Sequence, residues 1–189
     1  MRYDPEQHHR RSIRLPGWDC AGAGVCFVTI CTHGRACLFG EVVDGETRLS
    51  EYGQIVWACW VEIPAHFPHA EMDAFVVMPN HVHGIIMLVE QTGVGARHAV
   101  PLQNGTPPRM ERFGNPVPGS IPTVIRSFKS AVTKRINALR DAPGAPVWQR
   151  NYYEHIVRDE EELGHIRECI LGNPADWATD ENNPDILNR

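Results

Sequence analysis

The feature that most constrains the fold is a pair of short apolar runs separated by a proline. Residues 73–78 and 82–89 are rich in valine, isoleucine, methionine and phenylalanine, as buried β-strands are. Pro79-Asn80 between them marks a turn or a strand edge, because proline has no backbone N–H to donate to a sheet. The segment therefore predicts two strands, joined as a tight hairpin or continuing through a kink.

Two histidines, His81 and His83, stand two residues apart at the start of the second run. Successive side chains of a strand alternate between its faces, so both imidazoles lie on one face and Val82 points to the other. Neutral imidazoles are common metal ligands, and two of them on a rigid strand make half of a metal site. On spacing alone, a pair of solvent-facing polar residues explains them equally well.

Length and composition are those of one globular domain. The chain has 189 residues, 42% of them hydrophobic, which is enough for a sizeable core. The formal net charge of −5 argues against a protein that is basic all over, although nucleic-acid binding depends on where the charges lie. The six cysteines fit no usual zinc pattern, and reduced thiols in the cytoplasm are the default expectation. No run of 18 apolar residues predicts a membrane span.

The remaining elements are predicted from residue patterns and from the residues that begin or end a helix. Ser50 is a suitable N-cap for the first helix and Pro64 a suitable end, and the stretch that follows Gly40 has the composition of a polar loop. The predicted elements are a strand over 24–32, a helix over 50–63, a short extended segment over 145–157 and a last helix over 159–173.

The clearest helix is predicted over residues 120–140, with Ser120 as its cap and Pro122 in its first turn. Its apolar stripe consists of Ile125, Phe128, Val132, Ile136 and Leu139. The whole stretch from Arg112 to Arg140 has no acidic residue, so this helix is basic within an acidic protein. Such a face is often simply solvated, and the alternative is a surface that contacts DNA phosphates. The candidate DNA-binding side chains are Arg126, Lys129, Lys134 and Arg135, with Trp148 and Arg150 of the next segment.

Composition also predicts the domain boundaries. Residues 1–23 are polar and basic, and they form either an arm that contacts phosphates or a solvated terminus. Residues 91–119 are interrupted by glycine and proline without periodicity, which predicts a flexible loop or a solvated insertion. The sequence therefore predicts one domain over residues 24–178, with residues 179–189 as a short polar tail.

Four segments, taken in order, give the chain a specific resemblance. They are residues 76–86, 126–130, 147–156 and 166–174, and the pattern extends over roughly residues 24–178. A His-x-His pair alone recurs in many metal proteins. The four segments together resemble the REP-associated tyrosine transposases, which belong to the HUH family of single-tyrosine transposases.

This resemblance implies an α+β domain of the ferredoxin-like type, with a mostly antiparallel sheet and helices packed on one face. It implies a divalent metal, Mg²⁺ or Mn²⁺, held by His81, His83 and a polar side chain of the last helix, which Asn173 matches. In such a site the metal polarises a DNA phosphodiester, and a tyrosine one helical turn before the polar ligand attacks it. The implied partner is single-stranded or hairpin DNA. The family often forms dimers, so the resemblance further implies a possible homodimer.

The sequence departs from the family at the attacking residue. Cys169 stands at the position of the tyrosine, four residues before Asn173, so the two share one helix face. A cysteine reaches less far than a phenol, and it also fits as a small apolar residue of an amphipathic helix.

Two functions follow from the resemblance. The first is a transposase that cleaves and transfers single-stranded hairpin DNA in a metal-dependent reaction, and the alternative is a relative that binds such DNA and no longer cleaves it. A third class, the His-x-His hydrolases built on a barrel, needs about 250 residues in repeated strand–helix units, which this chain lacks.

Overall fold

The structure is a computed structural model that describes residues 23–89 and 117–187. Most of the predicted arm and of the predicted loop 91–119 lies outside the described residues. The elements are β1 (Gly24–Cys31), the 3-10 helix η1 (His33–Arg35), β2 (Gly40–Val43), β3 (Glu46–Leu49), α1 (Glu51–Val61), α2 (Ile63–His66), β4 (Ala70–Val77), β5 (His81–Leu88), α3 (Ile121–Leu139), β6 (Tyr153–Val157), α4 (Glu160–Gly172), the 3-10 helix η2 (Trp177–Thr179) and α5 (Pro184–Leu187).

Four strands form one antiparallel sheet in the order β4-β5-β1-β6. The succession β1-α1-β4-β5-α3-β6 is the βαββαβ pattern of ferredoxin-like folds, so the predicted α+β class is confirmed. The two apolar runs on either side of Pro79 pair with each other as β4 and β5. Of the two predicted arrangements, the hairpin is therefore the one that forms.

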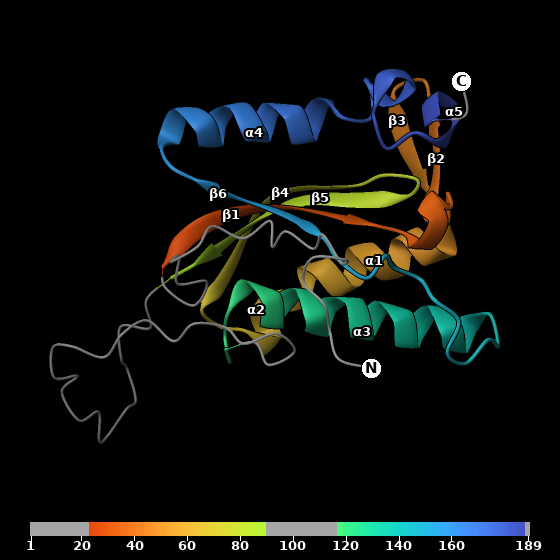
Figure 1. Cartoon of the computed structure of the whole chain (residues 1–189), viewed down its shortest axis with the longest axis horizontal. Coiled ribbons are helices and arrows are strands. Elements are labelled where there is room, and N and C mark those ends of the chain that lie inside the picture. The colour runs from red at the N-terminus through yellow and green to blue at the C-terminus, as the bar shows by residue number, and fades with distance from the viewer. Residues whose placement is uncertain (1–22, 90–116, 188–189) are drawn as a thin grey trace, which may run out of the picture.

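Helices cover both faces of the sheet, whereas the prediction placed them on one face (Figure 1). α1 and α3 lie on one face, where Val28 of β1 and Val82 of β5 are fully buried. α4 lies on the other face, where Ile170 packs in a second cluster with Ile85 of β5. A strand buried on both faces is apolar at nearly every position, which is the character of the run 82–89.

Most of the predicted apolar stripe of α3 is in the core. Ile125, Phe128, Val132 and Ile136 are buried, but Leu139 is 52% exposed. Leu139 is the last residue of the helix, so the buried stripe ends one turn earlier than predicted.

Residues 40–49 form the hairpin β2–β3 in place of the predicted polar loop. Asp44 and Gly45 at its turn have positive φ angles of 54° and 76°. Two successive positive φ angles are what a two-residue turn of type I′ requires, and Asp-Gly is among the pairs that supply them most readily. The turn signal was therefore present in the sequence.

α1 begins as predicted, because the Ser50 hydroxyl accepts a hydrogen bond from the Gly53 amide at 3.2 Å. It ends at Val61, and Pro64 does not stop a helix but lies in the first turn of α2. Proline is tolerated there because the N–H that it lacks has no helical partner in a first turn. None of the helices within residues 23–89 and 117–187 has the length and apolar character that a membrane span needs.

Candidate metal centre

The two histidines lie side by side at the start of β5, on the face of the sheet that α4 covers. Cys31 and Thr29 of β1 are opposite His81 and His83, respectively. His81 is fully buried and His83 is half-buried, and their ring centroids are 4.4 Å apart. Strand alternation therefore has the effect predicted from the spacing, and it brings both imidazoles to one point.

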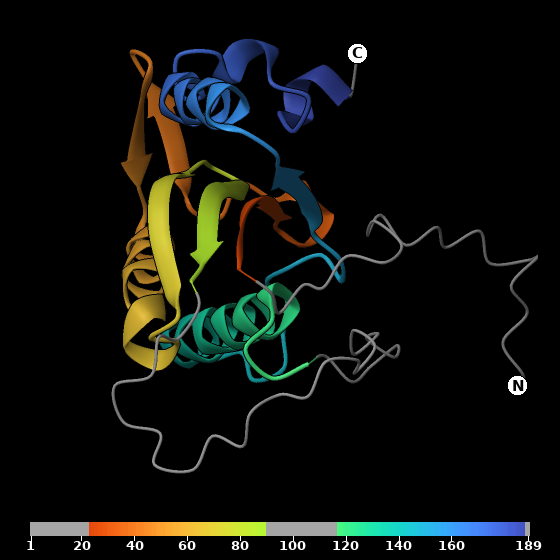
Figure 2. The ribbon, with the colours of Figure 1, turned by 90° about the vertical axis from the view of Figure 1, so that its left-hand side faces the viewer.

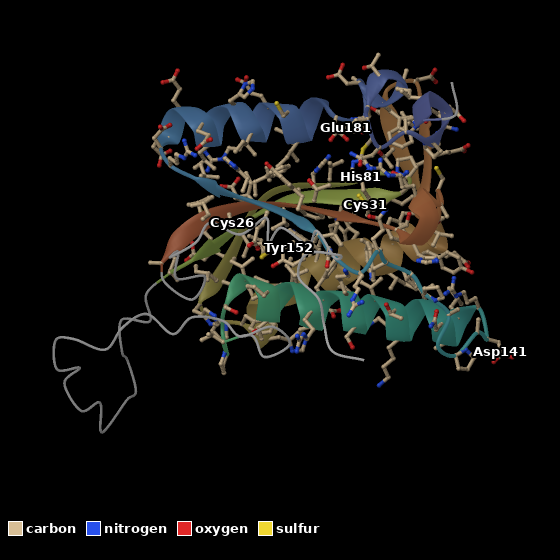
Figure 3. All side chains as sticks on the ribbon, in the orientation of Figure 1. Cys26, Cys31, His81, Asp141, Tyr152 and Glu181 are labelled. Carbon is tan, nitrogen blue, oxygen red and sulfur yellow. The ribbon has the colours of Figure 1, made fainter. Side chains whose placement is uncertain are left out.

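A carboxylate from the C-terminal segment completes the group. Ligand atoms of His81, His83 and Asp180 lie within 4.8 Å of one another, and Asp180 Oδ2 is 3.9 Å from His81 Nε2. Figure 3 shows His81 facing the segment that carries Glu181, the neighbour of Asp180 in the chain. Asp180 was not predicted as a ligand, because it lies in the predicted polar tail, where no local pattern distinguishes it from Glu181.

Asn173, the predicted third ligand, is the C-cap residue of α4 and lies beside this group. Its Nδ2 donates a hydrogen bond to Asp180 Oδ2 at 2.9 Å. Its Oδ1 is buried and has no hydrogen-bond partner among the described residues. The amide nitrogen thus positions Asp180, and the amide oxygen is left with free lone pairs. That Asn173 is itself a ligand stays a prediction.

Asn80 determines which nitrogen of His81 can bind a metal. Asn80 Nδ2 donates to the carbonyl oxygens of Arg35, at 3.1 Å, and of Asn182, at 2.7 Å. The other amide atom, Oδ1, is therefore an acceptor, and it lies 2.9 Å from His81 Nδ1. The proton of the neutral imidazole is consequently on Nδ1, and Nε2 directs a lone pair toward Asp180. This arrangement is common behind metal-binding histidines, where an outer hydrogen bond fixes tautomer and ring orientation.

The local electrostatics keep both imidazoles neutral. Burial lowers the pKa of His81 to about 4, and Asp180 and the neighbouring Asn173 side chain oppose this shift only in part. Burial, together with the neighbouring His81, lowers the pKa of His83 to about 3. Burial on its own raises the pKa of Asp180, but hydrogen bonds from the Asn182 amide and from Asn173 hold it below its ordinary value. At neutral pH the group therefore offers two uncharged nitrogen ligands and one carboxylate.

This set of donors fits a divalent cation. His81 Nε2 and Asn173 Oδ1 are buried without a hydrogen-bond partner in the part of the chain that the structure describes. Unpaired buried polar atoms are rare and costly, and a cation held between these two would satisfy both. Carboxylate and amide oxygens suit both Mg²⁺ and Mn²⁺, whereas imidazole nitrogens are typical ligands of transition metals.

Cys169 is exposed on α4, one turn before Asn173. Its sulfur lies 3.7 Å from Nε2 of His165, which is one further turn back along the helix. A thiol and an imidazole thus lie together on the part of α4 that leads to the metal centre. Whether Cys169 acts as a nucleophile stays a prediction.

The predicted DNA-binding side chains of α3 and the metal centre lie on opposite faces of the sheet (Figure 1). Lys129 Nζ donates to the Gln149 carbonyl at 2.6 Å, and burial lowers its pKa to about 8. Arg135 forms an ion pair with Glu62, the C-cap residue of α1. Two of the predicted cations are therefore paired within the protein.

The other predicted side chains lie at the surface or line a groove. Trp148 is buried, and its Nε1 donates to the Lys129 carbonyl at 3.2 Å. Arg126, Lys134 and Arg150 are exposed. Lys134, Trp148 and Arg150 line an open groove of about 710 Å³ near the C-terminal end of α3. Their contact with DNA stays a prediction.

Comparison with known proteins identifies relatives of the chain. No protein-family profile matches it. An uncharacterised protein of Haemophilus influenzae is 41% identical over 180 residues, which are 95% of this chain and 96% of that protein. A second protein of the same organism, named "Putative REP-associated tyrosine transposase", is 23% identical over 146 residues, 76% of this chain and 72% of that protein.

A solved structure has a similar fold. It is a REP-associated tyrosine transposase bound to a REP hairpin, with a TM-score of 0.53 and 19% sequence identity, and the match covers 84% of this chain and 70% of that one. At this identity the similarity concerns the fold, and it agrees with the resemblance carried by the four sequence segments.

Proposed function

This chain belongs to one family with the uncharacterised Haemophilus influenzae protein and is a distant relative of the REP-associated tyrosine transposases; from that premise we propose that it binds single-stranded, hairpin-forming DNA at a divalent metal centre. The observation that carries the proposal is the convergence of His81, His83 and Asp180 within 4.8 Å. A divalent ion held there supplies positive charge that attracts and polarises a DNA phosphodiester.

The residues of the centre have separate tasks in this proposal. His81, His83 and Asp180 hold the ion, and Asn173 fixes the Asp180 carboxylate through its amide nitrogen. Because the imidazoles are neutral, the three ligands carry a single negative charge and leave a net positive site for a phosphate. Burial strengthens this attraction, since charges interact more strongly away from water.

Metal binding and DNA binding can be measured on the same chains. We expect one Mn²⁺ per chain in titration calorimetry. In fluorescence anisotropy, the affinity for a labelled hairpin with a single-stranded flank should fall at least about ten-fold in EDTA. His83→Ala and Asp180→Asn should produce the same loss. His66→Ala and Asp185→Asn, which change exposed residues outside the centre, are the matched controls. Equal DNA affinity with and without metal, and in both variants, contradicts the proposal.

A second candidate function, cleavage of the bound strand, is favoured by the contact between Cys169 and His165 at 3.7 Å. A nucleophile next to a base is the arrangement that covalent catalysis uses. In this step the Cys169 sulfur bonds to phosphorus while His165 takes the thiol proton. The bond from phosphorus to the 3′ oxygen of the preceding nucleotide breaks, and that oxygen leaves as a hydroxyl after taking a proton from water.

Covalent adducts distinguish the two functions. Labelled hairpin DNA is incubated with Mn²⁺ and the protein, and the products are separated under denaturing conditions. An adduct that disappears in Cys169→Ala but persists in Cys37→Ala, another exposed thiol, indicates cleavage. No adduct with the unaltered chain, and one with Cys169→Tyr, indicates a DNA-binding relative that has lost cleavage.

A further inference from the structure

A row of side chains connects the metal centre with the free edge of the sheet. Thr29 of β1 lies opposite both His83 of β5 and Tyr153 of β6. Directly paired residues of an antiparallel sheet point to the same face. Tyr153 therefore lies on the face of the sheet that carries the metal centre, two strands away from His83.

Ring contacts fill the distance between them. Phe27 of β1 stacks with His83 at a centroid distance of 5.4 Å and an interplanar angle of 25°. The edge contact of Phe27 with Tyr153 has a centroid distance of 6.3 Å. The Tyr153 ring is thus within about 12 Å of the His83 ring. We call His81, His83, Phe27 and Tyr153 the aromatic row.

The outer end of the aromatic row is open. Arg167 of α4 forms an ion pair with Asp73 of β4, which ties the helix to the opposite edge of the sheet. Figure 2 shows α4 above the β4 side of the sheet, with β6 at the other edge. Tyr153 is 46% exposed. The ring thus presents a flat apolar surface next to the centre.

An unpaired nucleotide matches this surface in shape and charge. Its base has a flat π face, and its phosphate is an anion that suits a cation held by His81 and His83. Bases of single strands commonly stack on aromatic side chains, whatever their sequence, while the backbone is held by positive charge. Trp57 of α1 is similarly exposed, at 50%, but α1 covers the opposite face of the sheet, away from the phosphate site.

We propose that the aromatic row is a subsite for an unpaired nucleobase of single-stranded DNA, which stacks on Tyr153 while a neighbouring phosphate binds at the metal centre. The inference rests on the proposed function, and it adds a reason why single strands are preferred. In a duplex the base faces are already stacked on each other and cannot cover Tyr153.

The test compares Tyr153→Ala with Tyr153→Phe and with the control Trp57→Ala. Single-stranded DNA containing the fluorescent base 2-aminopurine reports stacking by quenching. Tyr153→Ala should lower the affinity for single strands roughly ten-fold and abolish the quenching. Tyr153→Phe and Trp57→Ala should keep both. Mn²⁺ affinity, duplex affinity and the salt dependence of binding should stay unchanged in Tyr153→Ala, because no phosphate contact is lost.

The outcomes separate the two proposals. If the unaltered chain binds single strands in a metal-dependent way and Tyr153→Ala binds and quenches equally well, the subsite is wrong and the proposed function stands. If the unaltered chain binds no single-stranded DNA, both are wrong. If Tyr153→Ala changes only self-association in sedimentation velocity, the aromatic row is a contact between copies of the chain and the subsite is again wrong.

Discussion

Replacement of Gly84 by alanine is expected to destabilise the protein strongly, because a methyl group has no space there. A Cβ at Gly84 would lie 2.2 and 2.7 Å from two carbon atoms of the Trp60 indole. Carbon atoms in contact are about 3.5–4.0 Å apart, so the ring would have to move by more than about 1 Å. Trp60 is fully buried, with Phe75 and Phe128 at centroid distances of 5.7 and 5.2 Å. In so closely packed a core, the displacement must spread to these neighbours.

The expected loss is about 3 kcal/mol, the upper end of the range for overpacked cores. That is a large part of the roughly 5–15 kcal/mol that stabilises a typical domain. Urea unfolding should show a lower midpoint with an unchanged m-value. Gly164→Ala in α4 is the matched control, since a Cβ there meets open space and should stabilise the helix by up to about 1 kcal/mol.

A double-mutant cycle tests the physical cause. Trp60→Leu removes the ring atoms that the new methyl group would touch. In that background Gly84→Ala should cost less than about 1 kcal/mol, which gives a large coupling energy between the two sites. If Gly84→Ala costs the same in both backgrounds, or less than about 0.5 kcal/mol alone, the indole is not what excludes a side chain at this position.

The other predictions concern the metal centre and the DNA contacts. Asn80→Ala should weaken Mn²⁺ binding about 10- to 100-fold in calorimetry, because His81 loses the acceptor that orients it. Asn137→Ala, which changes another buried amide, is the control and should leave Mn²⁺ affinity unchanged. In EDTA, protonation of His81 alone should lower the free energy of unfolding by about 2 kcal/mol as the pH falls from 7 to 5. The folded-state pKa of His81 is about 4 and the unfolded value about 6.5, so the unfolded chain takes up the proton first; urea titrations that show no such fall contradict the prediction. Arg150→Ala should lower the slope of log affinity against log salt by about one, the value of one phosphate contact. Arg135→Ala should leave the slope unchanged, because Arg135 is paired with Glu62. Anisotropy titrations at several salt concentrations measure both slopes.

The histidine pair was predictable because its geometry is local. Alternation along one strand is enough to place His81 and His83 on the same face, whatever the rest of the chain does. The Asp44-Gly45 turn has an equally local signal in its two positive φ angles, although a polar loop was predicted there. The order of the main helices and strands likewise follows from the hydrophobic periodicity of individual segments.

Asp180 was not predictable, because its position depends on contacts far apart in the chain. The segment is held by Asn80, whose Nδ2 donates to the Asn182 carbonyl, and by Asn173, which donates to Asp180 itself. The internal hydrogen bond of Lys129 was hidden for a similar reason. The sequence shows the charge of a lysine, but not that its ammonium group donates to the Gln149 carbonyl.

The hydrogen bonds between residues 180–182 and residues 35 and 80 also have a consequence for synthesis. Arg35 donates to the Glu181 carbonyl at 3.0 Å and Asn80 to the Asn182 carbonyl at 2.7 Å. These bonds can form only after a segment that follows the histidines by roughly one hundred residues has been synthesised. At ribosomal speeds of about 5–20 residues per second, the nascent chain carries the two imidazoles for about 5–20 seconds without their carboxylate. A chain interrupted in that interval has both histidines but not the acid. Under the proposed function, the complete set of ligands therefore exists only once residue 180 has been synthesised.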